Sequence, residues 1–265
     1  MHGLVTGSVL AESTLAETSS TNGSLRESST NGSSLRESST RKATRRGIAW
    51  IRSSSPPDRL NAQVDVVMAA AVASEPAMTA LFEELTLQSG GRLAGLEHRL
   101  KTRESLIGKG HRTIVELARQ ALEAREPLVI DAATVVWAIT DALRYTMVVP
   151  LERYTSAVSK VRSQLSDAGL RTVKLRNYWA PDTYKGINDV FAVDAASSPN
   201  GSLHVELQFH TAESFACKMG MHALYEDFRS TLDPVAKLAV QRQLHELVQS
   251  VPDPPGGLGD ANPKP

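Results

Sequence analysis

The sequence predicts an α/β fold of the α+β kind, with a mixed β-sheet of about five strands flanked by helices. Helical patterns come first along the chain, a strand–helix–strand unit follows, and a hairpin and two helices come last. The clearest strand is Leu203–His210, where four apolar residues alternate without error with His, Glu, Gln and His. A period of two places the apolar residues on one face and the polar residues on the other.

The N-terminal half of this pattern is helical. Apolar spacing typical of a helix covers Asp58–Leu87, and its interruption at Ser74–Pro76 predicts two helices, because Pro is tolerated in a first turn. Gly90–Gly91 is a break, and Gly95–Thr102 is compatible with an extended segment. Glu104–Ala124 is predicted to be a further helix.

In the second half, a strand–helix–strand unit is followed by two more strands and then by two helices. The expected elements are a strand at Tyr145–Val149, a helix at Leu151–Ala168, strands at Leu170–Tyr178, Ile187–Asp194 and Leu203–His210, and helices at Ser214–Phe228 and Asp233–Gln249. Gly169 ends the first of these helices, and a turn at Ser197–Gly201 joins the last two strands.

Composition divides the 265 residues into three parts. Residues 1–55 are rich in Ser, Thr, Gly and Asn and contain a near-repeat of ten residues, so we expect a disordered tail. Residues 56–251 have the composition of one globular domain with a sizeable core. Residues 252–265 are rich in Pro and Gly, and a second disordered tail is expected there.

Charge and cysteine usage give few hints of a partner. Lys plus Arg equal Asp plus Glu at 29 each, so no overall field favours nucleic acid or membrane. The one cysteine, Cys217, allows no intrachain disulfide and fits a reducing compartment. No run of 18 apolar residues exists, so we expect no membrane-spanning helix and a cytoplasmic location, with secretion as a toxin as the alternative.

The polar face of the strand Leu203–His210 is a candidate for one side of a functional site. His204, Glu206, Gln208 and His210 can bind protons, metals or phosphates, whereas solvated strand faces more often carry Thr, Lys or Ser. A solvated face remains the alternative. A zinc site is a weaker hypothesis, because ligands at His204 and His210 would be spread over about 20 Å of strand.

A second candidate lies at the start of a predicted helix. Arg99–Lys109 has the spacing R-x-K-x-x-x-S-x-x-x-K. On a helix, Lys101, Ser105 and Lys109 lie near one face, where cations and the helix N-terminus favour phosphate groups. Such spacings also occur on solvated helix faces.

Together with later motifs, this segment resembles the synthetase domain of the RelA/SpoT family, which makes guanosine tetra- and pentaphosphate. The likeness is to short, synthetase-only or toxin-like members, and it covers about residues 91–229. The matching motifs after Arg99–Lys109 are Asp141 in Ile139–Thr146, the Pro-, Lys- and Gly-containing loop Asn177–Asn188, Glu206–Thr211 and His222–Tyr225. The family's Arg is His210 here, its loop aromatic is Ile187, and Arg144 follows Asp141 by three residues instead of five.

The resemblance implies transfer of the β,γ-pyrophosphate of ATP to a ribose 3′-hydroxyl, with Mg²⁺ as cofactor. It implies that Asp141 and Glu206 hold the metal, with Glu206 as the alternative base for the hydroxyl and Gln208 orienting Glu206 or bonding the ribose. The residues expected to bind the donor phosphates are Arg99, Lys101, Ser105 and Lys109. Those expected to contact the acceptor are Lys174, Arg176, Lys185, Asn188 and His210.

The acceptor stays open among guanine nucleotides, adenine nucleotides and the 3′ end of transfer RNA. Ile187 argues against guanine stacking, and the neutral charge does not favour transfer RNA. An adenine acceptor would make the protein a toxin with an immunity protein as partner. A homo-oligomer is a further expectation from the family, and a catalytically inactive nucleotide-binding module is the alternative to an enzyme.

Overall fold

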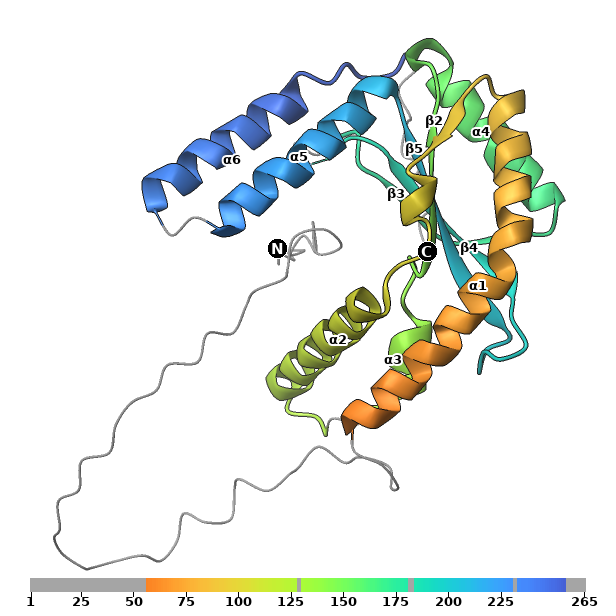
Figure 1. The fold of residues 1–265 in the computed structure, drawn as a ribbon, viewed down its shortest axis with the longest axis vertical. Coiled ribbons are helices and arrows are strands. Elements are labelled where there is room, and N and C mark those ends of the chain that lie inside the picture. The colour runs from red at the N-terminus through yellow and green to blue at the C-terminus, as the bar shows by residue number, and fades with distance from the viewer. Residues whose placement is uncertain (1–55, 128–129, 181–183, 231–232, 256–265) are drawn as a thin grey trace, which may run out of the picture.

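The five strands form one mixed sheet in the order β1-β2-β5-β4-β3 (Figure 1). The computed structural model describes residues 56–127, 130–180, 184–230 and 233–255. β2 and β5 are parallel and the other neighbours are antiparallel, which confirms the predicted fold class. The strands are β1 Arg92–Ala94, β2 Leu143–Val148, β3 Arg171–Asn177, β4 Ile187–Asp194 and β5 Ser202–His210.

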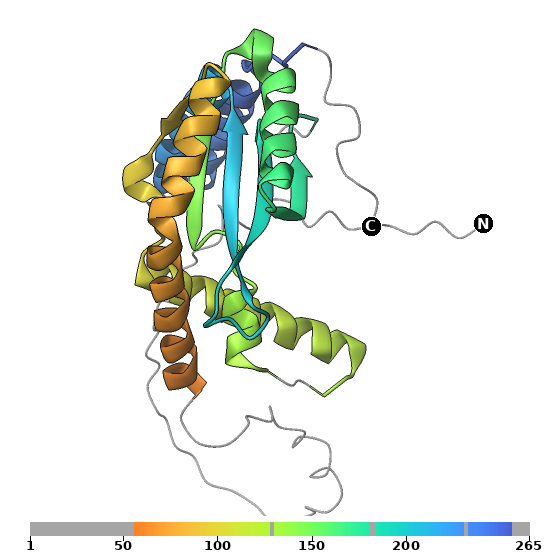
Figure 2. The same cartoon turned by 90° about the vertical axis from the view of Figure 1, so that its right-hand side faces the viewer.

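Helices lie on both sides of this sheet. They are α1 Pro56–Gln88, α2 Arg103–Ala124, α3 Ala132–Trp137, α4 Tyr154–Asp167, α5 Ala212–Ser230 and α6 Pro234–Gln249, with 3₁₀ turns η1 Leu96–His98 and η2 Leu151–Arg153. α1 and α4 cover one face of the sheet (Figure 2). α2, α5 and α6 lie toward the other side (Figure 1).

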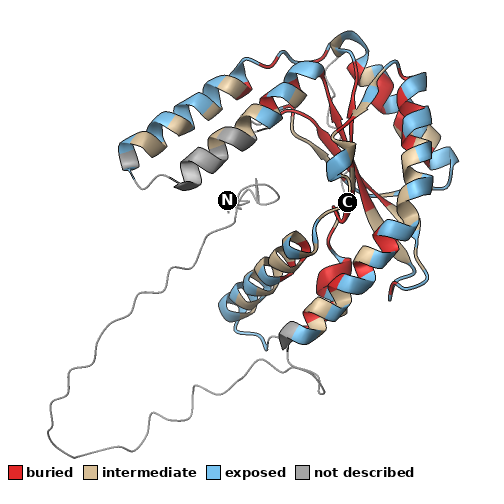
Figure 3. Ribbon diagram, in the orientation of Figure 1, coloured by how far each residue is buried: buried red, intermediate tan, exposed pale blue. Residues whose placement is uncertain are grey.

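The alternation predicted in β5 sorts its residues between the two faces. Leu203, Val205, Leu207 and Phe209 are almost completely buried and belong to the core cluster that includes residues of α1 and α4. Buried residues accordingly concentrate in the sheet and on the helices over this face, while α2 and α6 are mostly exposed or intermediate (Figure 3). Each such side chain contributes about 1.5–3 kcal/mol of hydrophobic stabilisation.

The predicted break at Ser74–Pro76 is wrong, because α1 continues through Pro76. Proline removes the N–H that would bond the carbonyl four residues earlier, but that residue, Val72, is exposed and water can satisfy its carbonyl. Within the helix, Thr79 Oγ1 donates to Glu75 Oε1 at 2.6 Å, and a tertiary contact holds the same residue, because the Tyr145 hydroxyl donates to the Glu75 carbonyl at 3.2 Å. Packing therefore overrides the local signal.

The segment between α1 and α2 also differs from the prediction. Gly95–Thr102 is not extended throughout, because Leu96–His98 forms the 3₁₀ turn η1, and Leu100 then makes an isolated bridge with Leu143. The Lys101 N–H donates to the Ala142 carbonyl at 3.0 Å. These contacts fix the start of α2 beside the start of β2.

By length and composition alone, Asp58–Gln88 of α1 could cross a membrane. In the structure the same helix buries Leu60, Val64 and Phe82 in the core cluster. The core helix of a globular domain meets the same length and composition test, so this feature does not locate the protein.

The predicted tails lie mostly outside the described residues, including all of residues 1–55. The structure does describe Pro252–Pro255, which contact the domain. Thr155 Oγ1 donates to the Pro255 carbonyl at 2.9 Å, and Lys185 Nζ lies 3.5 Å from the Asp253 carboxylate.

Candidate functional site

Strand register gathers most of the predicted residues on the sheet face opposite α1 and α4. Glu206 of β5 lies opposite Arg144 of β2 and Val190 of β4, and Gln208 lies opposite Thr146 and Asn188. Cross-strand neighbours share a face of a sheet. On β3, Lys174 lies opposite Val190 and Arg176 lies opposite Asn188. Two rows of neighbouring residues therefore cross the sheet, Arg144–Glu206–Val190–Lys174 and Thr146–Gln208–Asn188–Arg176.

A carboxylate held between two lysines stands at one end of this face. Asp141 precedes β2 and is 4% exposed. Lys101 Nζ lies 2.8 Å from Asp141 Oδ2, and Lys109 Nζ lies 2.8 Å from Oδ1. The lysine side chains remain 21% and 23% exposed. Both therefore pair with the buried carboxylate while staying accessible to a ligand.

Opposing effects set the charge state of this cluster. Burial by itself raises the pKa of Asp141, but the charges and hydrogen bonds of Lys109 and Lys101 outweigh it and lower the pKa to about 2. Asp141 is therefore ionised at neutral pH. Two cations on one carboxylate leave a net positive charge, which suits an anionic ligand such as a polyphosphate.

The other two residues predicted to bind donor phosphates are placed differently. Ser105 lies in the first turn of α2, one turn before Lys109, and its N–H donates to the side chain of the N-cap residue Thr102. Arg99 Nε instead donates to Glu75 Oε1 at 2.5 Å, which ties it to α1. The structure thus brings Lys101 and Lys109 together, and Arg99 has a protein carboxylate as its partner.

Glu206 sits at the centre of the polar face and is 8% exposed. Burial raises its pKa, and the negative charge of Asp141 raises it further, against the opposing effects of Arg144 and Lys109. Gln208 Nε2 donates to Glu206 Oε1 at 2.6 Å. A carboxylate with a raised pKa and one fixed oxygen can accept a proton from a hydroxyl group.

His210 is buried and does not face the surface. Its Nε2 lies 2.6 Å from the Tyr184 hydroxyl, and its Nδ1 lies 2.9 Å from Ser214 Oγ. Burial lowers the pKa of His210 well below its usual value, and the nearby charge of Lys218 lowers it further. A neutral imidazole with both nitrogens engaged supports Tyr184 rather than a charged ligand.

Two residues of the predicted acceptor loop also have protein partners. Lys185 is buried and donates to the Trp179 carbonyl at 2.6 Å, and Asn188 accepts from the Tyr184 hydroxyl at 3.3 Å. Lys185 therefore anchors the loop. Residues 181–183 of this loop, including the predicted Pro181, lie outside the described residues.

Lys174 and Arg176 extend the polar face along β3, at the sheet edge. Lys174 is exposed, but partial desolvation of its ammonium group and the charges of Arg176 and Lys109 lower its pKa. Arg176 donates to the Tyr178 hydroxyl at 3.1 Å. These cations flank Glu206 on the side away from Arg144, where they can meet a second anionic ligand.

The donor chemistry around Asp141 and Glu206 fits Mg²⁺ better than zinc. Within the described residues, no group of three or more His, Cys, Asp or Glu is arranged to hold a metal. Mg²⁺ needs only one or two carboxylates when substrate phosphates and water complete its shell. Besides burial, the negative charge of Asp141 raises the pKa of Glu206, so a cation held at Asp141 would also act on Glu206.

Sequence reasoning missed Lys218 on α5. Its Nζ donates to Gln208 Oε1 at 2.5 Å. Burial lowers the pKa of Lys218 to about 8, and the charge of Arg144 contributes to this shift. The available signal was the spacing of Ser214 and Lys218, four residues apart on the helix that directly follows β5.

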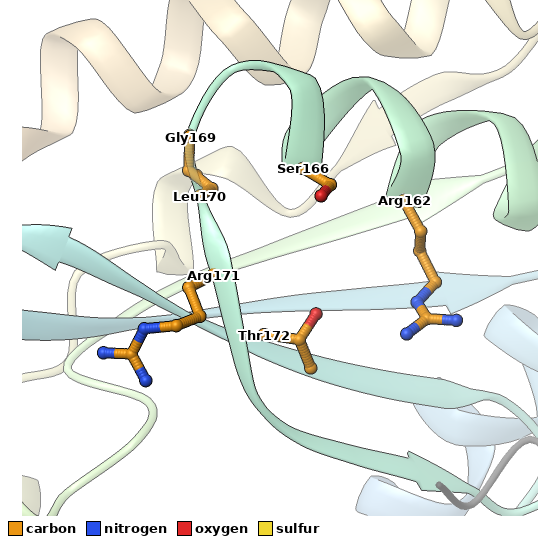
Figure 4. Close-up of a pocket in the computed structure, with 6 residues that line it drawn as sticks. All are labelled: Arg162, Ser166, Gly169, Leu170, Arg171 and Thr172. Atoms are coloured by element: carbon orange, nitrogen blue, oxygen red, sulfur yellow. The ribbon is translucent and has the colours of Figure 1, made fainter.

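A separate cavity of about 330 Å³ lies where α4 meets β3 (Figure 4). None of the predicted site residues lines it, and its two arginines, Arg162 and Arg171, point away from each other. Arg162 Nε pairs with the buried Asp189 at 2.7 Å. The cavity is therefore distinct from the polar face. Its lining residues are Arg162, Ser166, Gly169, Leu170, Arg171 and Thr172.

No protein-family model matches the chain, and neither does any curated protein. Among solved structures, it is similar to small alarmone synthetase 2 from Bacillus subtilis, with 14% identity, a TM-score of 0.45 and coverage of 69% of this chain and 92% of that one. Small alarmone synthetase 1 from the same organism is 16% identical, with a TM-score of 0.43 and coverage of 72% of this chain and 90% of that one. A GTP pyrophosphokinase family protein from Streptococcus pneumoniae is 17% identical, with a TM-score of 0.43 and coverage of 70% of this chain and 87% of that one. Similarity at this level does not establish a function.

Proposed function

We propose that this protein is an ATP-dependent pyrophosphokinase that transfers the β,γ-pyrophosphate of ATP to the 3′-hydroxyl of a nucleotide. The observation that carries the proposal is the Lys101–Asp141–Lys109 cluster, whose Asp141 and Lys109 charges act on the buried Glu206 of β5. Cations for phosphates, a carboxylate for a metal and a second carboxylate for a proton are the groups that this reaction needs.

The donor phosphates bind at the start of α2. Lys101 and Lys109 are accessible, and they exchange Asp141 for phosphate oxygens when ATP enters. Ser105, in the first turn, adds its hydroxyl, and the N-terminus of α2 adds the positive end of its dipole. Release of the two lysines leaves the Asp141 carboxylate available for a new cation.

Asp141 would hold Mg²⁺, while Glu206 is kept for the proton of the acceptor. The ion would supply positive charge to the phosphate oxygens as negative charge shifts toward the leaving AMP. Exchange of the lysines for Mg²⁺ keeps the buried Asp141 compensated at each stage, which a buried carboxylate requires.

Glu206 accepts the proton of the acceptor 3′-hydroxyl. The hydroxyl oxygen forms a bond to the β-phosphorus, the bond between that phosphorus and the oxygen bridging to the α-phosphate breaks, and AMP leaves with that oxygen. Gln208 occupies Glu206 Oε1, so Oε2 is the oxygen that meets the acceptor. The raised pKa of Glu206 makes it a stronger base than an exposed carboxylate.

The acceptor binds toward β3. Lys174 and Arg176 offer cations for its phosphates, and Tyr178 offers a partly exposed ring for its base. Ile187 is almost completely buried and aligned with Phe209 on the core-facing side, so it forms no stacking surface. This arrangement favours a nucleotide over a transfer RNA, which requires a broad basic surface.

A nucleotide-panel assay tests the proposal. The purified full chain is mixed with Mg²⁺, ATP labelled at the β-phosphate and one acceptor at a time: GDP, GTP, AMP, ADP, ATP or transfer RNA. Glu206→Gln should lower the transfer rate at least about 100-fold. Glu152→Gln, at an exposed position in η2, is the matched control and should leave the rate unchanged. Absence of transfer to every acceptor, with ATP binding intact, would leave only a nucleotide-binding module.

A further inference from the structure

The side chains of Lys218, Gln208 and Glu206 form a hydrogen-bonded chain in which the direction from donor to acceptor is fixed. Lys218 Nζ donates to Gln208 Oε1 at 2.5 Å, and Gln208 Nε2 donates to Glu206 Oε1 at 2.6 Å. An ammonium group is only a donor, so the amide oxygen of Gln208 must face Lys218 and its NH₂ must face Glu206. The opposite amide orientation would place an NH₂ against Lys218 and an oxygen against a carboxylate.

The other contacts of Gln208 do not fix the amide as firmly. Thr146 Oγ1 approaches Gln208 Oε1 at 3.4 Å, and a hydroxyl can also accept from an NH₂ group. Thr146 is therefore compatible with either amide orientation. Among the described residues that bond to Gln208, only Lys218 and Glu206 discriminate between the two orientations.

Lys218 is held in place by its own surroundings. It projects from α5, and its Nζ lies 5.8 Å from the centre of the Phe215 ring, within the range of a cation–π contact. Burial lowers the pKa of Lys218, and the positive charge of Arg144 acts against the charge of Lys218 and lowers its pKa further. A partly buried ammonium next to another cation is costly, and sites that bear such a cost are often functional.

We propose that Lys218 is a positioning residue, which orients the Gln208 amide and thereby reserves Glu206 Oε2 for the acceptor hydroxyl. The proposal rests on the proposed function. Lys218 does not touch the reacting atoms in this scheme and acts only through Gln208. Its loss should therefore lower the rate of transfer and leave nucleotide binding largely intact.

Steady-state kinetics test the catalytic part of this role. Lys218→Met keeps the length of the side chain and removes its donor and charge. We expect kcat to fall about 10- to 100-fold, with the KM values for ATP and acceptor changing less than about 3-fold. Lys218→Arg, which still donates to the amide oxygen, should recover most of the loss. Lys160→Met, on an exposed part of α4, is the matched control and should match the unsubstituted protein.

An NMR measurement tests the orientation of the amide without any turnover. The side-chain NH₂ signals of Gln208, assigned by their absence in Gln208→Leu, should shift in Lys218→Met and be retained in Lys218→Arg. Unchanged signals in Lys218→Met would overturn the positioning role even if the protein catalysed no transfer. Normal kcat in Lys218→Met would overturn it where transfer is observed. If Lys218→Met fails to fold, a folded Lys218→Arg protein that has lost transfer or these signals would also overturn it.

Discussion

Asp141→Asn should destabilise the protein strongly at neutral pH and less in acid. In the folded protein the pKa of this carboxyl is lowered from 3.8 to about 2 by the two lysines, against the effect of burial. At about 1.4 kcal/mol per unit, the ionised form contributes roughly 2 kcal/mol of stability. A lowered pKa stabilises the fold fully above about pH 4, and the contribution disappears as the pH falls toward 2. The side chain is 4% exposed, so solvent screens it little.

Urea unfolding followed by the fluorescence of the buried Trp137 and Trp179 measures this contribution. The free energy of unfolding of Asp141→Asn should be lower than that of the original protein by roughly 2 kcal/mol at pH 7 and by about half of that at pH 3. Asp167→Asn, at an exposed position at the end of α4, should change stability by less than about 0.5 kcal/mol at both pH values. A loss for Asp141→Asn that is equal at pH 7 and pH 3, or smaller than that of the control, would show that the two lysines do not stabilise an ionised Asp141.

Three other substitutions, at Asp189, Tyr184 and Lys109, have measurable consequences. Burial raises the pKa of Asp189 to about 6, so its ionisation opposes folding as the pH rises from 4 to 7. In urea unfolding, the free energy of unfolding of Asp189→Asn should therefore rise relative to that of the original protein by up to roughly 3 kcal/mol over that range. A difference that stays constant with pH would contradict this. Tyr184→Phe leaves the buried His210 Nε2 unpaired and should cost about 1–3 kcal/mol, whereas an unchanged melting temperature would show that the bond is not needed. Lys109→Met should weaken MgATP binding at least about tenfold by calorimetry, with Lys160→Met as the control; equal affinities would place the phosphates elsewhere.

Local periodicity predicted the part of the fold that carries the polar face. The alternation in β5 fixed which side chains point away from the core, because it depends on the geometry of a single element, which sequence expresses directly. Ser105 and Lys109 do lie on α2, but Lys101 precedes that helix, and it meets Asp141 because its N–H bonds to the Ala142 carbonyl. The parallel pairing of β2 with β5 follows from the helix and hairpin between them.

What the sequence did not predict depends on contacts between distant segments. Arg99 bonds to Glu75, 24 residues earlier, and the same Glu75 region helps α1 to continue through Pro76. The Lys218–Gln208 bond depends on how α5 packs against β5, which no local pattern encodes. Such pairings arise from tertiary packing, and propensity is a weak guide to them.

In the proposed reaction the β- and γ-phosphates of ATP move together, and a doubly labelled donor reveals whether they do. ATP carrying separate labels on the β- and γ-phosphates is incubated with Mg²⁺, the full chain and the nucleotide acceptors. The proposed reaction predicts one product that contains both labels in equal amounts, formed in step with AMP and lost in Glu206→Gln. Transfer of the γ-label alone, with release of ADP, would contradict this reaction and identify an ordinary kinase.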